Sequence, residues 1–176
     1  MPFTVAPMER CDAQAVADLW RRYMLETYGE VGHMTPESFV RDGLGDGFHT
    51  MVAKDVDGSP VAVAVWWMTY DAHHGARGGE IPDMFAAPAC RKLGVAVQLV
   101  AAIARAVRDR GGVFLRGPAT PGNANRLAVR GHLSGAFPVI NVYWAHGLFD
   151  ALADNAGATA RTLTRRVAAA GRADHG

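Results

Sequence analysis

Residues 79–107, GEIPDMFAAPACRKLGVAVQLVAAIARAV, decide the fold of this chain, because they read as a strand that runs into a long helix. The apolar strand over 80–86 stops before Pro88, where the proline fixes φ and removes a hydrogen-bond donor. From Val95 onward, apolar residues recur at helical spacing until Gly111, which predicts a helix of about four turns. The loop between the two elements therefore places a helix N-terminus next to the end of a strand.

This loop has the composition of a phosphate-binding segment. Gly94 lets the backbone approach a ligand, and the small side chain of Ala96 leaves room beside it. The first amides of a helix, together with the positive end of its dipole, bind phosphate, and Arg91 and Lys92 add charge. We therefore expect a diphosphate here. The expected contact residues are Arg91, Lys92, Leu93, Gly94, Val95, Ala96 and Val97.

With the strand, loop and helix in place, the segment resembles the acyl-CoA signature of the GNAT superfamily of N-acyltransferases. That signature, Arg/Gln-x-x-Gly-x-Gly/Ala, is met by Arg91, Gly94 and Ala96. The lead-in DMFAAP at 83–88 also resembles the family, and the likeness extends over roughly residues 3–145. The resemblance implies an α/β (α+β) fold. Its central sheet would be mixed but mostly antiparallel, splayed between strands 4 and 5, with helices on both faces.

The same resemblance implies acetyl-CoA as the cofactor, with coenzyme A as a product. The pantetheine arm would enter the splay and pair with backbone around Met84, Phe85 and Ala86. Asn125 resembles the residue that hydrogen-bonds the pantetheine or orders the helix start beside it. Pro82 fits this picture, because the family carries a bulge in the fourth strand, where a missing donor costs less.

The remaining chain predicts alternating elements in the family's order, β-α-α-β-β-β-α-β-α-β. Further strands are predicted over 3–6, 49–56, 61–70, 113–116 and 139–145, and further helices from 12, over 35–44 and over 121–131. The tail departs from the family, because short helices at 148–153 and 159–167 follow where a strand would be usual, and we expect disorder over 168–176. Either one strand is absent, or 131–137 contains it. We expect a single domain over 1–150 and a helical extension with a flexible tail over 151–176.

Two carboxylates on the fourth strand are candidates for proton transfer. Glu80 lies where many family members keep an acid that relays the amine proton through water, and Asp83 lies nearer the thioester. Their odd spacing predicts opposite faces of the sheet, so that only one looks into the cleft. The alternative for each is a surface salt bridge, or a cap on the loop over 72–79.

The general acid of the family is usually a tyrosine in the last helix. Aligning Asn125 and Ala128 with the family pattern puts His132 in its place, whereas a register starting at Asn123 puts Arg130 there. Neither register supplies a tyrosine. We expect either His132 or water to protonate the departing thiolate.

The acceptor pocket is expected between the first helix and the loop that follows residue 70. By resemblance, Tyr28 and Glu30 wall this pocket together with Trp66 and Tyr70, and their acidic and aromatic character suits a cationic amine. Trp66 and Tyr70 alternatively belong to the core. The adjacent His73 and His74 have no third ligand at suitable spacing, so we expect no metal site.

Composition narrows the possible partners. The 176-residue chain is 49% hydrophobic, with 18 Lys and Arg against 17 Asp and Glu, so it has no field for nucleic acid or an anionic membrane. No apolar run is long enough to span a bilayer and no secretory signal opens the chain, so we expect a cytoplasmic protein whose Cys11 and Cys90 are free thiols. Pairing of edge strands favours a homodimer.

Three function classes follow. The first is an acetyl-CoA-dependent N-acetyltransferase that acts on a primary amine of a small molecule, by direct attack in a ternary complex. The second is an acetyltransferase of protein N-termini or lysines. The third is an acyl-CoA-binding sensor without turnover, which the missing tyrosine leaves open.

Overall fold

The structure is a computed structural model, and it describes residues 3–119, 132–134 and 140–173. Its elements along the chain are β1 (Thr4–Pro7), the 3-10 helix η1 (Arg10–Asp12), α1 (Ala13–Tyr28), α2 (Pro36–Asp42), β2 (His49–Lys54), β3 (Pro60–Asp71), β4 (Ala76–Ala86), the 3-10 helix η2 (Pro88–Cys90), α3 (Val95–Arg108), β5 (Phe114–Ala119), β6 (His132–Ser134), β7 (Ile140–Ala145), α4 (His146–Asp154) and α5 (Ala160–Ala173). The helix predicted over 121–131 lies outside the described residues.

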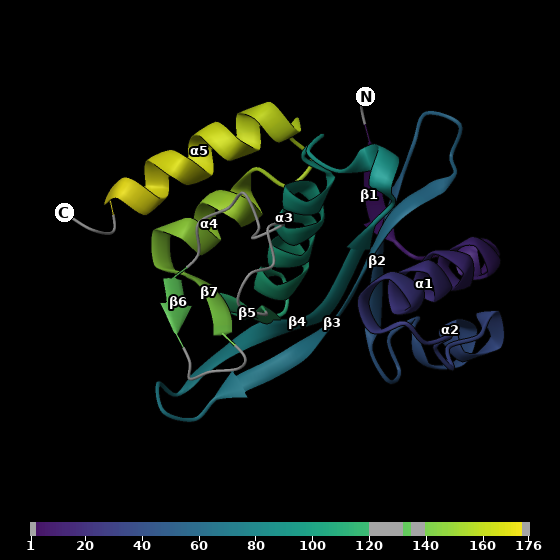
Figure 1. The fold of residues 1–176 in the computed structure, drawn as a ribbon. Coiled ribbons are helices and arrows are strands. Elements are labelled where there is room, and N and C mark those ends of the chain that lie inside the picture. The colour runs from purple at the N-terminus through teal and green to yellow at the C-terminus, as the bar shows by residue number, and fades with distance from the viewer. Residues whose placement is uncertain (1–2, 120–131, 135–139, 174–176) are drawn as a thin grey trace.

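The strands form one sheet with helices on both faces. Its order over the described residues is β1-β2-β3-β4-β5-β7-β6, and every neighbouring pair is antiparallel except β4 and β5, which are parallel. Helices α1 and α2 cover one face near β1 to β3, whereas α3, α4 and α5 cover the other (Figure 1). The predicted mixed, mostly antiparallel α/β fold is therefore confirmed.

Strand β3 shows why helices pack on both faces of the sheet. Alternate side chains point to opposite faces, so Ala64 and Trp66 pack toward α3, whereas Val63 and Val65 pack toward α1. The α3 side is filled by Leu99 and other apolar residues of that helix. Both faces of β3 are apolar because both faces are buried along this stretch.

Several boundaries differ from the sequence prediction. Strand β4 begins at Ala76, so residues expected in a loop pair with the end of β3 instead. Strand β6 lies within 131–137, so of the two alternatives the second is correct, and this region contains the additional strand. Helix α5 extends to Ala173, which corrects the expected disorder over 168–173. Its alanine-rich end has high intrinsic helix propensity, which favours continuation of the helix.

The C-terminal extension shares the main core. Leu163 of α5 is fully buried in the same cluster as Leu99 and Trp144. On α4, Asp154 pairs with Arg108 of α3, with an oxygen to nitrogen distance of 2.5 Å. These contacts attach the extension to α3, the helix that carries the predicted phosphate site.

Truncation of Leu163 to alanine is expected to lower the free energy of unfolding by about 2–5 kcal/mol, because it leaves a cavity in a closed core. Chemical denaturation measures the change. The matched control is Leu25→Ala in α1, where the side chain is exposed and a change within about 0.5 kcal/mol is expected. Equal losses in the two variants would contradict the placement of α5.

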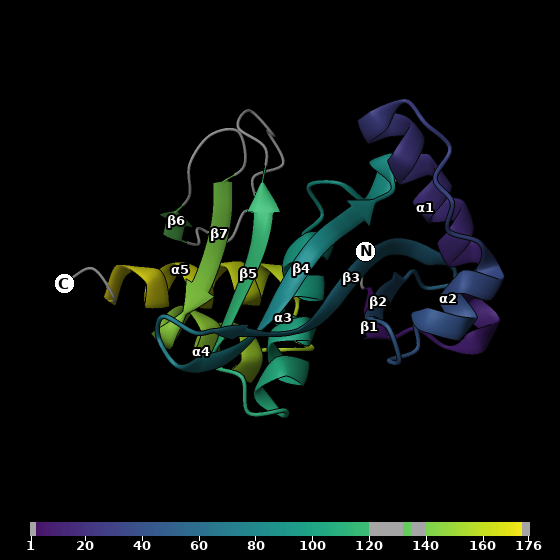
Figure 2. The same cartoon turned by 90° about the horizontal axis from the view of Figure 1, so that it is seen from below.

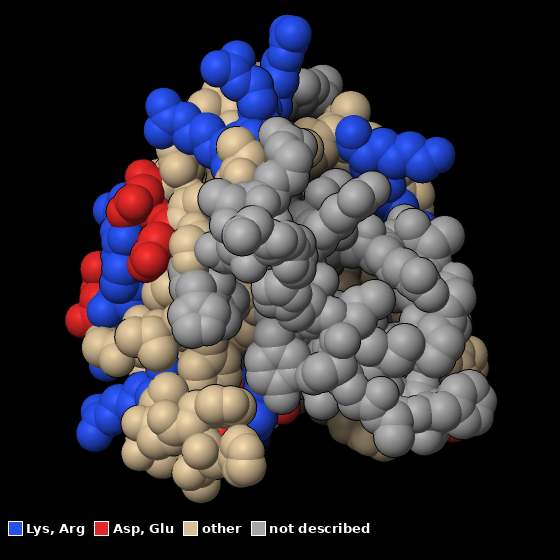
Figure 3. Space-filling model, turned by 90° about the vertical axis from the view of Figure 1, so that its left-hand side faces the viewer, with Lys and Arg blue, Asp and Glu red and all other residues tan. Residues whose placement is uncertain are grey.

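The face of the molecule drawn in Figure 3 carries side chains of both charges. Figure 3 shows basic side chains gathered at its upper edge and acidic side chains lying among basic ones at its left. Among the described residues, no helix combines the length and apolarity needed to cross a bilayer.

Candidate active site

Strands β4 and β5 part beside the middle of the sheet. Their pairing is limited to Gly79 with Leu115 and Glu80 with Arg116, although β4 continues to Ala86. Figure 2 shows the two strands diverging toward their C-terminal ends. The predicted splay between strands 4 and 5 is therefore present. Beyond Glu80, the β5-facing edge of β4 has backbone groups that no strand of the described chain pairs.

The start of α3 lies next to this parting, and its backbone is unusual. Lys92 has φ 64°, and no other described residue besides glycine has a positive φ; Gly94, the N-cap, has φ 83°. Two residues in the left-handed region within three positions turn the chain, and such a turn leaves successive backbone N–H groups without an acceptor in the chain. Within the described part of the chain, the N–H groups from Lys92 to Val97 make no well-formed hydrogen bond. They are available to an anion, as the sequence predicts.

Arg91 is engaged elsewhere. Its Nε donates to the carbonyl of Ala86 at 3.0 Å, its Nη2 lies 2.6 Å from a carboxylate oxygen of Glu26, and its guanidinium lies over the ring of Phe85. The hydrogen bond from Arg91 holds the pKa of Glu26 below its ordinary value. Arg91 thus ties the loop to α1, and the exposed charge in the loop belongs to Lys92.

The predicted pantetheine wall divides between the two faces of β4. Phe85 is buried on the α1 side, whereas Met84 and Ala86 pack against the α3 side. Their backbone nevertheless lies along the edge from which β5 has departed. The carbonyl of Ala86 already accepts a hydrogen bond from Arg91, which limits its pairing with pantetheine.

The structure corrects the prediction that Glu80 and Asp83 face opposite sides of the sheet. Asp83 pairs with Val65 and Glu80 with Trp67, so two residues of β4 stand opposite the single Trp66. This bulge adds one residue and shifts the alternation by one position. Both carboxylates therefore lie on the α1 side, and Pro82 occupies the bulge, where its missing donor costs no ladder bond.

Glu80 is paired with a cation. Its Oε2 lies 2.7 Å from Nη2 and 3.0 Å from Nε of Arg116, and the same Nη2 donates to Thr69 Oγ1 at 3.1 Å. All three residues are part-buried. Arg116 therefore balances the negative charge of Glu80, and the two residues also form the last pair between β4 and β5. This ion pair suits Glu80 to a structural role, in which it holds the two strands together where they part.

Asp83 has a different environment, which sequence reasoning missed. The buried Tyr23 of α1 donates its hydroxyl to Asp83 Oδ1, and that hydroxyl also lies 3.3 Å from the hydroxyl of Tyr28. Burial first, and then the hydrogen bond to Asp83, strongly raise the pKa of Tyr23, so it stays protonated. The signal in the sequence was a tyrosine at an apolar helix position, because a buried phenol needs a partner.

Of the predicted acceptor residues, only Tyr28 is linked to Asp83 within the described chain, through the hydroxyl of Tyr23. Trp66 is 2% exposed and packs on the α3 side, so it belongs to the core, and Tyr70 follows the same alternation at the exposed end of β3. Glu30 lies on the surface beyond α1. Trp67, 37% exposed, follows Val65 in the alternation of β3 and therefore lies on the face that carries both carboxylates.

Asn125 and His132 were both predicted as site residues from the family pattern of the last helix. Asn125 lies outside the described residues. His132 begins β6, opposite Tyr143 of β7, and so lies in a strand rather than in a helix. Strands β7 and β5 lie between β6 and β4, so His132 is not in a strand next to that of Asp83. The backbone therefore lends no support to His132 as the acid.

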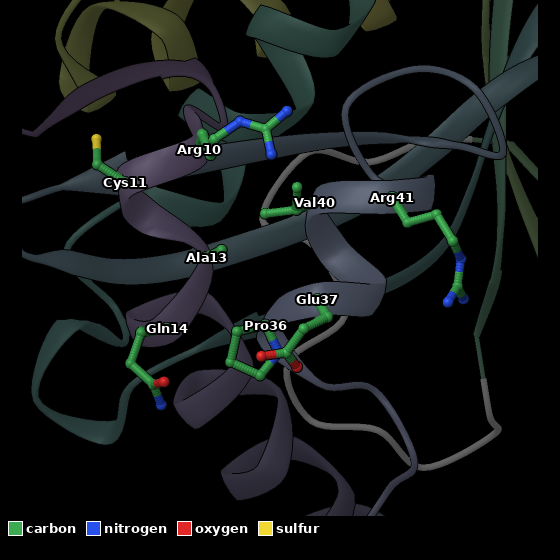
Figure 4. Close-up of a pocket in the computed structure, with 8 residues that line it drawn as sticks. All are labelled: Arg10, Cys11, Ala13, Gln14, Pro36, Glu37, Val40 and Arg41. Carbon is green, nitrogen blue, oxygen red and sulfur yellow. The ribbon is translucent and has the colours of Figure 1, made fainter.

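Two surface pockets flank the first helix. One, of about 380 Å³, is lined by Arg22, Leu25, Glu26, Phe85 and Pro88, and lies on the same face as Asp83. The other, of about 400 Å³, lies between the start of α1 and α2, away from the parted strands (Figure 4). In that region Glu9, Cys11 and Asp12 have ligand atoms within 4.8 Å of one another. Asp12 there already pairs with Lys54 and accepts from the Glu9 amide, which explains the cluster as a helix cap.

Comparison with known proteins adds to this geometry. None of the curated proteins matches the sequence. Among solved structures, a ribosomal-protein-alanine N-acetyltransferase from Brucella melitensis is similar with a TM-score of 0.65 and 16% identity, over 81% of this chain and 99% of that chain. An N-acetyltransferase from Staphylococcus aureus Mu50 has a TM-score of 0.64 and 11% identity, over 82% and 99%. A GNAT phosphinothricin acetyltransferase from Sinorhizobium meliloti, solved with acetyl-CoA, has a TM-score of 0.60 and 15% identity. The similarity covers 81% of this chain and 86% of that chain.

The family model described as Acetyltransferase (GNAT) family matches residues 13–130. This range starts with α1 and includes the parted strands, the loop with its free amides, and α3. The match covers more than half of the chain, and the fold similarity agrees with it. The chain belongs to the GNAT family of acetyltransferases.

Proposed function

We propose that this protein transfers an acetyl group from acetyl-CoA to a primary amine of a small molecule, by direct attack in a ternary complex. The observation that carries the proposal is the parting of β4 from β5 directly beside the free amides from Lys92 to Val97. A diphosphate on those amides would direct the pantetheine arm along the edge of β4 from Ala86 toward Glu80. GNAT membership supplies the donor, since the family uses acetyl-CoA.

The acetyl donor contributes an activated thioester. Two proton transfers accompany the reaction, because the acceptor ammonium loses a proton before attack and the departing thiolate gains one. An alkyl amine is an ammonium at neutral pH, with a reference pKa of about 10.4, so it loses a proton before its nitrogen can attack. Asp83 is the best placed base, because Tyr23 fixes one of its oxygens and no cation of the described chain pairs with it. Glu80, balanced by Arg116, is less suited to the task.

Positioning is the other contribution of the protein. The carbon to nitrogen bond forms as the carbon to sulfur bond breaks, and the thiol that leaves has a reference pKa of about 8.5, so water can protonate it. The fixed edge of β4 would hold the thioester, while α1 holds the acceptor side. On the acceptor side, an open surface hollow lies between α1 and the end of β4, beside Phe85.

The test is release of free thiol when the protein is mixed with acetyl-CoA and a panel of amines, amino acids and short peptides. Thiol release that depends on a small amine, with the acetylated amine confirmed by mass spectrometry, is the expected result. Preference for peptides would instead favour an acetyltransferase of protein N-termini or lysines. Heat of binding with coenzyme A but no transfer to any acceptor would favour a sensor, and no heat at all would remove the cofactor site.

A further inference from the structure

A directed chain of hydrogen bonds runs from the C-terminal end of α1 to β4. Tyr23 has one hydroxyl proton, and Asp83 as a carboxylate only accepts, so that proton goes to Asp83 Oδ1. The contact between the two phenols must then run from Tyr28 to the oxygen of Tyr23. The order Tyr28 to Tyr23 to Asp83 follows from counting protons.

This chain leaves one oxygen of Asp83 unused. Within the described residues, Asp83 Oδ2 has no hydrogen-bond partner, and no cationic side chain pairs with Asp83. Glu80 shares the same face, but Arg116 balances its charge. Of these two carboxylates of β4, Asp83 is therefore the one whose negative charge no cation of the described chain balances.

Exposed aromatic surface lies on the same side. Tyr28 is 57% exposed while its hydroxyl reaches the chain of hydrogen bonds, and Trp67 of β3 lies one alternation beyond Val65, the residue opposite Asp83. A carboxylate oxygen on a face that also exposes aromatic rings suits a cation better than an anion or a neutral group.

We propose that Tyr23 is a positioning residue, which fixes Asp83 so that its free oxygen receives the ammonium group of a cationic alkyl amine. This inference rests on the proposed function and names the acceptor class for it. One proton passes from the ammonium nitrogen to Asp83 Oδ2, which becomes a carboxylic acid, and the nitrogen uses the freed electron pair to attack the thioester carbonyl carbon. The carbon to sulfur bond then breaks, and the second proton that the nitrogen loses passes through water to the departing thiolate. Tyr23 retains its own proton throughout, and Asp83 returns its proton to water after the product leaves.

The test uses two probes of similar size, benzylamine, which is an ammonium at pH 7, and aniline, which is neutral there. For Tyr23→Phe, which keeps the ring and removes the hydroxyl, kcat/KM with benzylamine is expected to fall roughly 10- to 100-fold. With aniline the loss is expected to stay below about threefold, because aniline needs no proton removed before attack. The KM for acetyl-CoA should not change.

A double-mutant cycle separates positioning from a merely structural role. If Tyr23 acts through Asp83, Tyr23→Phe should have no further effect in an Asp83→Asn background, whereas a structural effect would add. Tyr28→Phe, one bond further away, should cost less than Tyr23→Phe. Should Tyr23→Phe fail to fold, Asp83→Asn alone still tests the free oxygen, through the same selective loss with benzylamine.

The outcomes distinguish this inference from the proposed function. Transfer by the wild type with equal losses for the two probes, additive losses in the cycle, or a wild-type preference for aniline overturns the inference alone. Absence of transfer to either probe overturns the inference, while transfer to another amine of the panel upholds the proposed function. Absence of transfer to every amine overturns both.

Discussion

Asp83→Asn is expected to lower turnover of an ammonium acceptor by about 10²- to 10⁴-fold, because the substitution removes the base and the charge but keeps the shape. The amide oxygen of asparagine can still accept from Tyr23, so the link between β4 and α1 survives. Binding of coenzyme A should change little, since the free amides lie at the start of α3. Initial rates of thiol release and calorimetric titration with coenzyme A measure the two quantities.

Two matched variants sharpen this result. Glu80→Gln removes the other carboxylate of the same face and should cost less than about tenfold in turnover, because Glu80 is balanced by Arg116. Asp57→Asn, in the exposed turn between β2 and β3, controls for the chemistry of the substitution and should leave turnover unchanged. A larger loss in Glu80→Gln than in Asp83→Asn would transfer the role of base to Glu80.

Much of this fold could be predicted because its signals are local. The strand, loop and helix over 79–107 follow from a proline, a glycine and apolar periodicity, and each acts within a few residues. The helix predicted over 35–44 starts with an equally local signal, because Thr35 is the N-cap of α2 and its Oγ1 accepts from the Ser38 amide. Such features depend little on what packs against them.

The face of each carboxylate could not be predicted, because it depends on strand pairing. Alternation alone separates Glu80 from Asp83, and it fails once Ile81 and Pro82 share one partner on β3. Pro82 marked the place of the bulge in the sequence. Its effect on the side chains appears only from the register with Val65 and Trp67.

The contacts that define the site join distant parts of the chain. Tyr23 and Asp83 are 60 residues apart, and Arg91 and Glu26 are 65 apart, so no local pattern links either pair. The sequence alone placed Arg91 on a phosphate, and it shows Tyr23 only as one of the apolar positions of the first helix. In both cases, α1 packing across β4 supplied the partner.

Gly94→Ala is expected to lower the free energy of unfolding by about 2–5 kcal/mol and to weaken binding of coenzyme A at least about tenfold. Two effects add. Gly94 has φ 83°, which costs an alanine about 1–2 kcal/mol. A Cβ at this position would also lie 2.1 Å from the Cβ of Ala160, at the start of α5, and such overpacking costs about 1–3 kcal/mol. Relief of either strain would move the amides that follow Gly94, and with them the anion site.

The chain offers a control for each effect. Gly157→Ala places alanine at φ 90° with nothing within 4 Å, so its loss, about 1–2 kcal/mol, measures the backbone effect alone. Combining Gly94→Ala with Ala160→Gly removes the collision, and the pair should recover most of the overpacking cost. Chemical denaturation of these variants, with coenzyme A titrations on the same samples, resolves both effects. If Gly94→Ala costs no more than Gly157→Ala and binds coenzyme A normally, then α5 does not press on this turn and the turn does not form the cofactor site.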